Sequence, residues 1–171
     1  MRIIIILLFF FLSLSSCRKQ EVGQHRLEYL MDIVIGAGQN PLQTHVYEKA
    51  IRSGWAQFLS NNQLHDSLIE KVLIYSITAR PLLAEPISYG FVEEARAFIA
   101  DKDLPSTQQI GIGNPIPGES VGDLQLLPGI ADIKNFLRKD IFHLILNLRY
   151  RNSIRSTTDH LVTFRFEVFV K

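Results

Sequence analysis

Two segments in the last third of the chain alternate between large apolar and polar residues. Residues 141–150 and 161–170 both follow this pattern, which is typical of a strand buried on one face. The apolar residues are Phe142, Leu144, Leu146, Leu148 and Tyr150 in the first segment and Val162, Phe164, Phe166, Val168 and Val170 in the second. Two such strands need another apolar layer over their inner faces, so the chain must build a layered β fold. The polar segment 151–159 joins them as a long hairpin loop or as a crossover between two sheets.

Five earlier segments are also predicted to be strands. Residues 31–35 are apolar and β-branched, and residues 108–112 and 123–127 lie within a region rich in glycine and proline. Residues 89–100 fit a strand or a short helix, and their aromatic ends and flanking turns favour a strand. Residues 69–79 form a β run whose more apolar face we expect to meet the core. That face carries Leu73, Tyr75, Ile77 and Ala79.

Two segments carry helical spacing. The apolar residues between positions 44 and 60 favour a helix over 47–59, although residues 43–48 could instead continue as a strand. The pair Asn61-Asn62 is expected to end this element. A second, shorter helix is predicted over 132–137, with Asp132 as its N-cap.

The order of these elements indicates the fold class. About seven strands, one or two short helices and no alternation of strand and helix predict a mostly β, antiparallel, Ig-like β-sandwich. An up-and-down barrel is the alternative. We find no internal repeat in the chain.

The first seventeen residues have the layout of an export signal. Arg2 precedes an uncharged, wholly apolar run over 3–12, and Ser15 and Ser16 stand directly before Cys17, which is the only cysteine in the chain. The apolar run is shorter than the ~20 residues that a membrane-spanning helix needs. Leu14-Ser15-Ser16-Cys17 resembles the lipobox of bacterial lipoproteins.

This resemblance implies that residues 1–16 are removed and that Cys17 is diacylated. The bilayer is then a partner through acylated Cys17, residues 17–26 form a flexible tether, and residues 27–171 form a single domain. Acylation also leaves no thiol for a disulfide. In the sorting rule familiar for such proteins, Arg18 after the cysteine implies a place in the cell envelope at the outer membrane, facing the periplasm or the outside.

The later part of the chain loosely resembles uncharacterised extracytoplasmic lipoproteins built on a small β-sandwich. The resemblance rests on Leu126-Leu127-Pro128, the 132–137 helix and the two closing strands. It implies no activity.

The charges give little support to nucleic-acid binding. The chain has 18 Lys and Arg against 17 Asp and Glu, and loss of Arg2 makes the numbers equal. From Asp132 onward, however, the sequence contains eight basic residues and only four acidic ones. This surplus could meet anionic lipid or polysaccharide. We favour the simpler interpretation that it covers a solvated strand edge.

No catalytic, cofactor-binding or metal site is predicted. The five histidines, His25, His45, His65, His143 and His160, lack metal-ligand spacing, and we expect them at the surface or in loops. Ser120 lies in a GxSxG sequence at 118–122, but a predicted strand follows it instead of the helix that a nucleophile elbow needs, and the SxxK sequence at 16–19 contains Cys17 itself, so neither predicts a nucleophilic serine. Asp101 and Asp103 could donate oxygens to calcium from the turn at 101–105, but the rest of a calcium loop is missing.

These observations favour a non-catalytic binding domain that holds an envelope protein or a glycan. The aromatic residues Trp55, Tyr75, Tyr89, Phe91 and Tyr150 could stack on sugars if they were exposed together, although core packing is the simpler role. The alternative function is a glycan or peptidoglycan hydrolase. Its candidate residues are Glu93, Glu94, Asp101, Asp103, His143 and His160. Glu93 and Glu94 are expected on opposite faces of a strand, which would keep them from acting as a pair.

Overall fold

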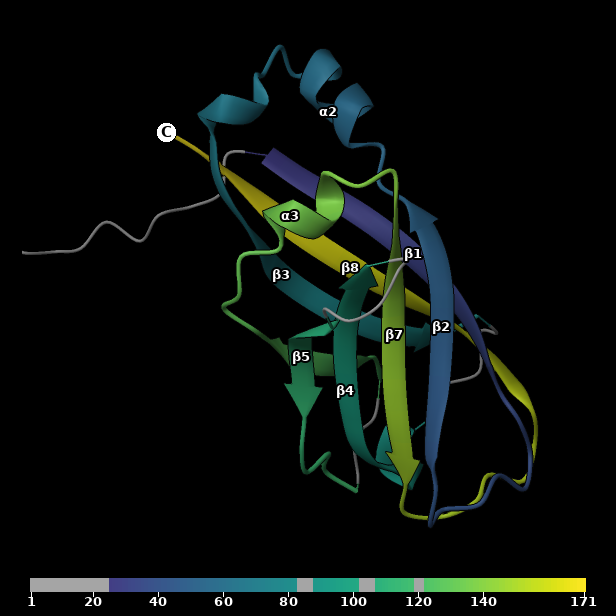
Figure 1. The fold of residues 1–171 in the computed structure, drawn as a ribbon. Helices are drawn as coiled ribbons and strands as arrows, with labels where there is room; N and C mark the ends of the chain where they lie inside the picture. Colours follow the sequence, from purple (N-terminus) through teal and green to yellow (C-terminus); the bar gives the residue numbers. More distant parts are fainter. Residues whose placement is uncertain (1–24, 83–87, 102–106, 119–121) are drawn as a thin grey trace, which may run out of the picture.

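The computed structural model describes residues 25–82, 88–101, 107–118 and 122–171. Within these residues, eight strands form one antiparallel sheet in the order β1-β8-β3-β6-β5-β4-β7-β2. The sheet curls into a nearly closed, barrel-like shape (Figure 1). The strands are β1 (His25–Ile35), β2 (Thr44–Arg52), β3 (Ile69–Pro81), β4 (Val92–Asp101), β5 (Thr107–Gly113), β6 (Leu124–Pro128), β7 (Ile141–Tyr150) and β8 (Thr158–Val170). The helical elements are α2 (Trp55–Asn61), α3 (Lys134–Leu137) and the 3-10 turns η1 (Asp66–Leu68) and η2 (Tyr89–Phe91).

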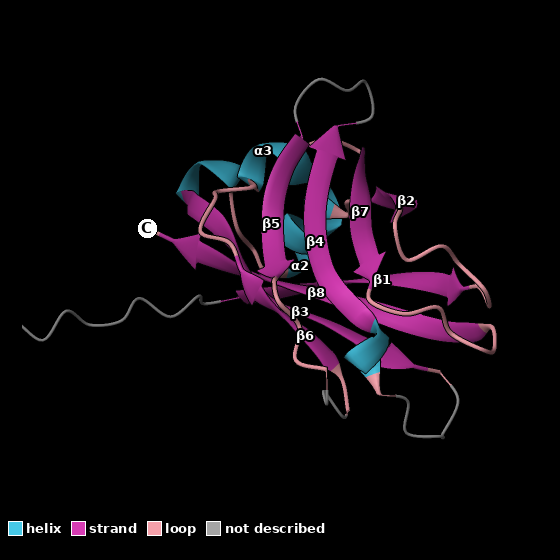
Figure 2. Ribbon diagram, turned by 90° about the horizontal axis from the view of Figure 1, so that it is seen from below, coloured by secondary structure: helices cyan, strands magenta, loops and turns pink. Residues whose placement is uncertain are grey.

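The predicted fold class is confirmed as mostly β and antiparallel with short helices, whereas the Ig-like sandwich is not confirmed. Strand β6 pairs with β3 on one side and with β5 on the other. The two halves of the sheet, which cross in Figure 2, are therefore continuous. The order is not that of an up-and-down barrel either, because β7 and β8 lie in different halves. The segment between them is a crossover, which was one of the two predicted possibilities.

The seam between the edge strands β1 and β2 is bridged by side chains. Lys49 donates hydrogen bonds to the carbonyl oxygen of Leu30 and to Oδ2 of Asp32, both at 3.2 Å. The hydroxyl of Tyr29 donates to the carbonyl oxygen of Ser53 at 2.5 Å. A lysine at an edge discourages pairing with other chains. These side-chain contacts join β1 to β2, which are not paired by backbone hydrogen bonds.

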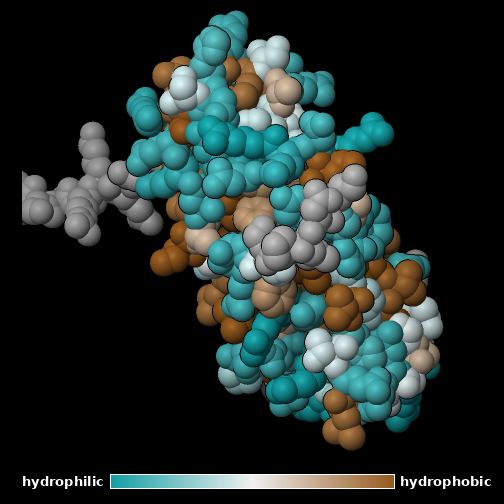
Figure 3. Space-filling view, in the orientation of Figure 1, coloured by the Kyte–Doolittle hydropathy of each residue, from teal (hydrophilic) through white to brown (hydrophobic). Residues whose placement is uncertain are grey.

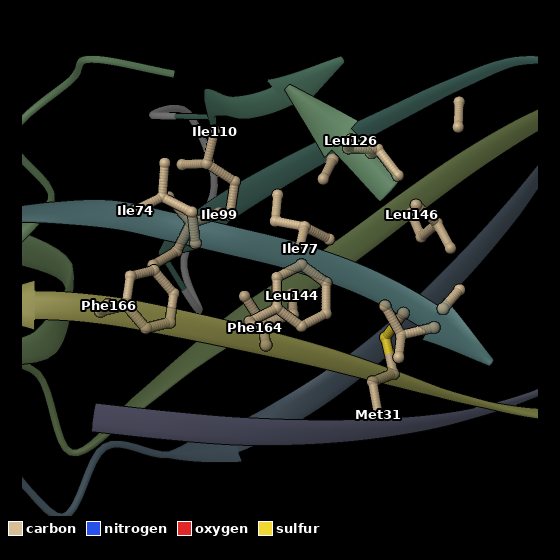
Figure 4. Packing of buried hydrophobic residues seen from close by; sticks show 14 of the residues in the cluster. Met31, Ile74, Ile77, Ile99, Ile110, Leu126, Leu144, Leu146, Phe164 and Phe166 are labelled. Carbon is tan, nitrogen blue, oxygen red and sulfur yellow. The ribbon is translucent and has the colours of Figure 1, made fainter. Parts of the chain in front are cut away.

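The core is formed by the inner faces of both halves, as Figure 4 shows for side chains from β1 and from β3 to β8. The predicted inward faces of β7 and β8 are confirmed except at Val170, which is only partly buried, and Thr163 on the other face of β8 is buried as well. Their inward residues are at most 1% exposed and comprise Phe142, Leu144, Leu146, Leu148, Val162, Phe164, Phe166 and Val168. Burying a large apolar side chain contributes about 1.5–3 kcal/mol. These two strands therefore supply much of the stability of the domain.

The predicted inner face of β3 is correct only for its second half. Ile77 and Ala79 are buried as expected, but Tyr75 is 48% exposed, and Val72 and Ile74 are buried in its place. The pairing with β8 shifts register between Ile74 and Ser76. A bulge adds one residue to one strand, so it exchanges the faces on either side of itself.

The predicted helix over 47–59 is wrong in its first half, where the alternative of a strand is correct. Residues up to Arg52 belong to β2, which pairs with β7 along its whole length. Val46, which contributed to the helical spacing, is 61% exposed on the outer face. The helix α2 begins only after Gly54, which has a φ of 61°, and it ends at Asn61 as predicted.

Strand β1 starts at His25, before the predicted domain boundary at residue 27. The strand therefore takes up the end of the expected tether. The remainder of the tether, Cys17 and residues 1–16 lie outside the described residues. Strands β4, β5 and β6 confirm the segments predicted around residues 89–100, 108–112 and 123–127.

The helix α3 begins later than predicted, because its N-cap is Ile133 rather than Asp132. The Asp132 carboxylate still accepts a hydrogen bond from the backbone N–H of Lys134 at 3.0 Å. It also accepts one from the N–H of Val72 at 2.9 Å. Asp132 therefore ties the start of α3 to β3.

The helix α2 covers one end of the barrel-like sheet (Figure 1). Trp55 and Phe58 point inward from it, and the indole N–H of Trp55 donates to Asp66 at 2.9 Å. Asp66 also accepts from Arg138, and this hydrogen bond is the main cause that lowers the pKa of Asp66. Among the described residues, no helix has the length and apolar character needed to cross a membrane.

Candidate functional site

A polar hollow of about 240 Å³ lies on the outer face of β2, β7 and β4. It is lined by Thr44, Glu94, Arg96, Phe98, Asn147 and Arg149. Figure 3 shows hydrophilic and hydrophobic side chains mixed on the face that these strands turn to the viewer in Figure 1. We call this site the β4–β7 hollow.

The strand register places these side chains in rows across the sheet. Arg149 of β7 lies between Thr44 of β2 and Glu94 of β4. In the next row, Asn147 lies opposite Arg96. Outward residues alternate along each strand with the core residues, so the burial of one face fixes the position of the other.

Glu93 and Glu94 come together in this site, so their predicted separation on opposite faces is wrong. The pairing of β4 with β7 shifts register between Val92 and Glu94, which leaves Glu93 as an extra residue. As a result, Oε2 of Glu93 lies 3.1 Å from Nε of Arg149, and Oε2 of Glu94 lies 3.4 Å from Nη2. Arg96 also donates to Glu94 through its Nε. Both carboxylates are therefore ion-paired.

The other predicted acids and histidines do not join the hollow lining. Asp101 pairs with Lys139 at 3.3 Å, and His143 contacts Glu48 on the outer face of β2 and β7. Asp103 lies outside the described residues. Among the residues that are described, no group of three His, Cys, Asp or Glu side chains could hold a metal ion.

His160 is fully buried, which corrects its predicted place at the surface or in a loop. Its Nδ1 lies 2.7 Å from the hydroxyl of Tyr89, and its Nε2 lies 2.7 Å from the hydroxyl of Thr158. Burial lowers the pKa of His160, and nearby Asp159 partly opposes this effect. The histidine therefore links η2 to the start of β8 in its neutral form.

We expect the domain to lose stability as the pH falls below about 6.5, the ordinary pKa of histidine. Below this pH the unfolded chain binds a proton at residue 160, whereas folded His160 binds it only at a lower pH because its pKa is lowered. The loss continues until the pH reaches the folded pKa. Urea denaturation across this range should show that the free energy of unfolding falls more steeply with falling pH in the unchanged protein than in the His160→Gln variant. Equal slopes would contradict the assignment.

The predicted aromatic platform does not form, and core packing is confirmed for most of its members. Trp55, Tyr89 and Tyr150 are at most 6% exposed. Tyr89 and Tyr150 both lie near Phe91, with ring centroids 6.0 and 5.7 Å from it. Tyr75 is exposed by itself, under the guanidinium of Arg26.

The basic residues of the last third do not form one patch. Lys139 precedes β7 and Arg151 follows it, so they lie at opposite ends of the sheet. Arg149 and Arg165 lie on β7 and β8, which are interior strands, so these two residues do not cover a strand edge. Several are ion-paired, such as Arg165 with Glu28 at 2.7 Å.

Sequence reasoning missed five of the six lining residues, which are Thr44, Arg96, Phe98, Asn147 and Arg149. The alternation in 141–150 did place Asn147 and Arg149 on the polar face of their strand. It could not show that β4 lies beside them, because pairing between distant strands leaves no local pattern. The bulge at Glu93 gave no local signal either.

Comparisons with known proteins identify no family. No family model matches the chain, and no curated protein matches it. A solved structure from Desmodium yellow mottle tymovirus is similar over 86% of this chain and 89% of that chain, with 9% identity and a TM-score of 0.26. A likeness this low carries no argument about fold or function.

Proposed function

We propose that this protein is a lipid-anchored binding domain of the bacterial cell envelope, held at the outer membrane by acylated Cys17. The observation that carries the anchor is the sequence Leu14-Ser15-Ser16-Cys17 behind the apolar run 3–12. Between Cys17 and His25 the chain is short, and each residue spans at most ~3.6 Å. The domain therefore stays close to its membrane.

Binding rather than catalysis is supported by the contacts of the two glutamates at the β4–β7 hollow. Glycoside hydrolysis requires one carboxylic acid and one carboxylate on the two sides of the scissile bond. Here Glu93 and Glu94 contact the same guanidinium of Arg149. Both carboxylates are therefore held in ion pairs on the same side of the hollow, which leaves no opposed pair across a scissile bond. The residues that the structure describes give no observation that favours the hydrolase, and the partner that we propose is an envelope protein or a glycan rather than a nucleic acid.

Replacement of Cys17 by alanine tests the anchor. We expect the variant to lose labelling by radioactive palmitate and to leave the membrane fraction or to accumulate as the uncut precursor. The matched control is Ser16→Ala, which keeps a small residue before the cysteine and should be processed normally. A Cys17→Ala variant that still labels and still sediments with membranes would refute the lipoprotein assignment.

A further inference from the structure

The β4–β7 hollow balances its charges. Arg96 and Arg149 are offset by Glu93 and Glu94, which lie within ion-pair distance of them. A phosphate, sulfate or carboxylate entering the hollow would meet Glu94 as well as the arginines. An ammonium group would be repelled by the two arginines. Because burying an unpaired charge is costly, this balance favours a neutral ligand.

Hydrogen-bonding groups of both kinds remain for such a ligand. A guanidinium carries five N–H donors, and the ion pairs use only Nε of Arg96 and Nε and Nη2 of Arg149. Among the described residues, Oδ1 of Asn147 is buried and has no hydrogen-bond partner. A buried acceptor without a partner is unfavourable, and a bound donor would relieve it once the Asn147 amide turns its Oδ1 toward the hollow. The hydroxyl group matches this mixture, because it donates and accepts at once.

The hollow also has an apolar wall. Phe98 lines it from β4, and Ile145 lies opposite Phe98 on β7. An aromatic ring next to planar polar side chains suits a molecule with a C–H face and hydroxyl edges. The volume of about 240 Å³ is below that of pockets for drug-sized ligands, ~300–1,000 Å³. It admits one ring at a time.

We propose that the β4–β7 hollow binds a neutral saccharide, one unit of a glycan chain that crosses the outer face of β7. This deepens the binding function proposed above, since it names the ligand class of that site. The ligand would contact Asn147 and Arg149 through hydroxyl groups and Phe98 through its C–H face.

Calorimetric titration of the acylated protein purified from membranes tests the proposal. The protein is kept in a zwitterionic detergent, because maltoside head groups would compete. The neutral probes are tetramers of N-acetylglucosamine and of glucose, and the anionic probe is a tetramer of galacturonic acid. We expect a neutral tetramer to bind at least about tenfold more tightly than the anionic one. Tighter binding of the anionic tetramer, or no heat with any of the three tetramers, would overturn the proposal.

Variants locate the binding. Asn147→Leu and Arg149→Gln should each weaken saccharide binding by about tenfold or more. Arg165→Gln is the matched control, because its side chain is 44% exposed like that of Arg149 and it also pairs with a glutamate. Equal losses in the control, or none in the two variants, would overturn the site. Each variant must first show the melting temperature of a folded domain.

The saccharide test is independent of the anchor. The Cys17→Ala protein should bind the neutral tetramer as tightly as the acylated one. If Cys17→Ala still labels with palmitate and still sediments with membranes, the anchor is refuted and the saccharide site stands. If it leaves membranes but binds no sugar, the saccharide site is refuted and the anchor stands.

Discussion

Truncation of Phe164 to alanine is expected to lower the free energy of unfolding by about 3–5 kcal/mol. Phe164 of β8 is fully buried, and it faces the same core as Leu144 and Leu146 of β7. Removing its ring leaves a cavity that the curled sheet cannot fill, because neighbouring strands fix its backbone on both sides. A domain with a typical stability of ~5–15 kcal/mol would then be close to unfolding. Urea denaturation of the purified protein measures the change.

The adjacent residue Arg165 provides the control on the same strand. Its side chain lies on the outer face, 44% exposed, and pairs with Glu28. Such surface pairs contribute about 0–1 kcal/mol, so Arg165→Ala should change stability by no more than that. Equal losses for Phe164→Ala and Arg165→Ala would mean that β8 is buried on both faces, which contradicts the fold.

Replacement of Gly90 by alanine is expected to destabilise the domain by about 1–3 kcal/mol or more. A Cβ atom on Gly90 would lie 1.8 Å from the carbonyl oxygen of Gly118 and 2.8 Å from its carbonyl carbon. These are backbone atoms, so the conflict cannot be relieved by turning a side chain. The same region is held by Arg151, which donates to the carbonyl oxygens of Gly90 at 2.8 Å and of Ile116 at 3.0 Å. Thermal unfolding reports the loss.

Gly36 is the matched control for Gly90. A Cβ atom on Gly36 would meet nothing closer than 3.7 Å. Gly36→Ala should therefore be neutral or slightly stabilising, since alanine restricts the unfolded chain. If Gly90→Ala were as harmless as Gly36→Ala, the close approach of η2 to Gly118 would be incorrect.

The parts of the fold that were predictable from the sequence are those with a local pattern. The strict alternation in β7 and β8 predicts both strands and both of their faces, because burial on one side selects every second residue. Around Val46 and Ala50 the apolar spacing fits both a helix and a strand. This segment forms a strand because it pairs with β7. Tyr75 was assigned to the wrong face because a bulge between Ile74 and Ser76 breaks the alternation.

The candidate site was less predictable, because it depends on contacts between distant strands. Glu93 and Glu94 were recognised as a pair but were placed on opposite faces, and only the register shift opposite Arg149 brings them together. His160 was assigned to the surface because a single histidine in a polar stretch gives no sign of burial. Its hydroxyl partners Tyr89 and Thr158 come from different parts of the chain.

The mass of the protein purified from membranes tests the central claim, that this is a domain anchored through acylated Cys17, most directly. We predict that the chain starts at Cys17, lacks residues 1–16 and carries the added mass of a diacylglycerol group on that residue. A chain that begins at Met1, or one with a free thiol at Cys17, would contradict the account.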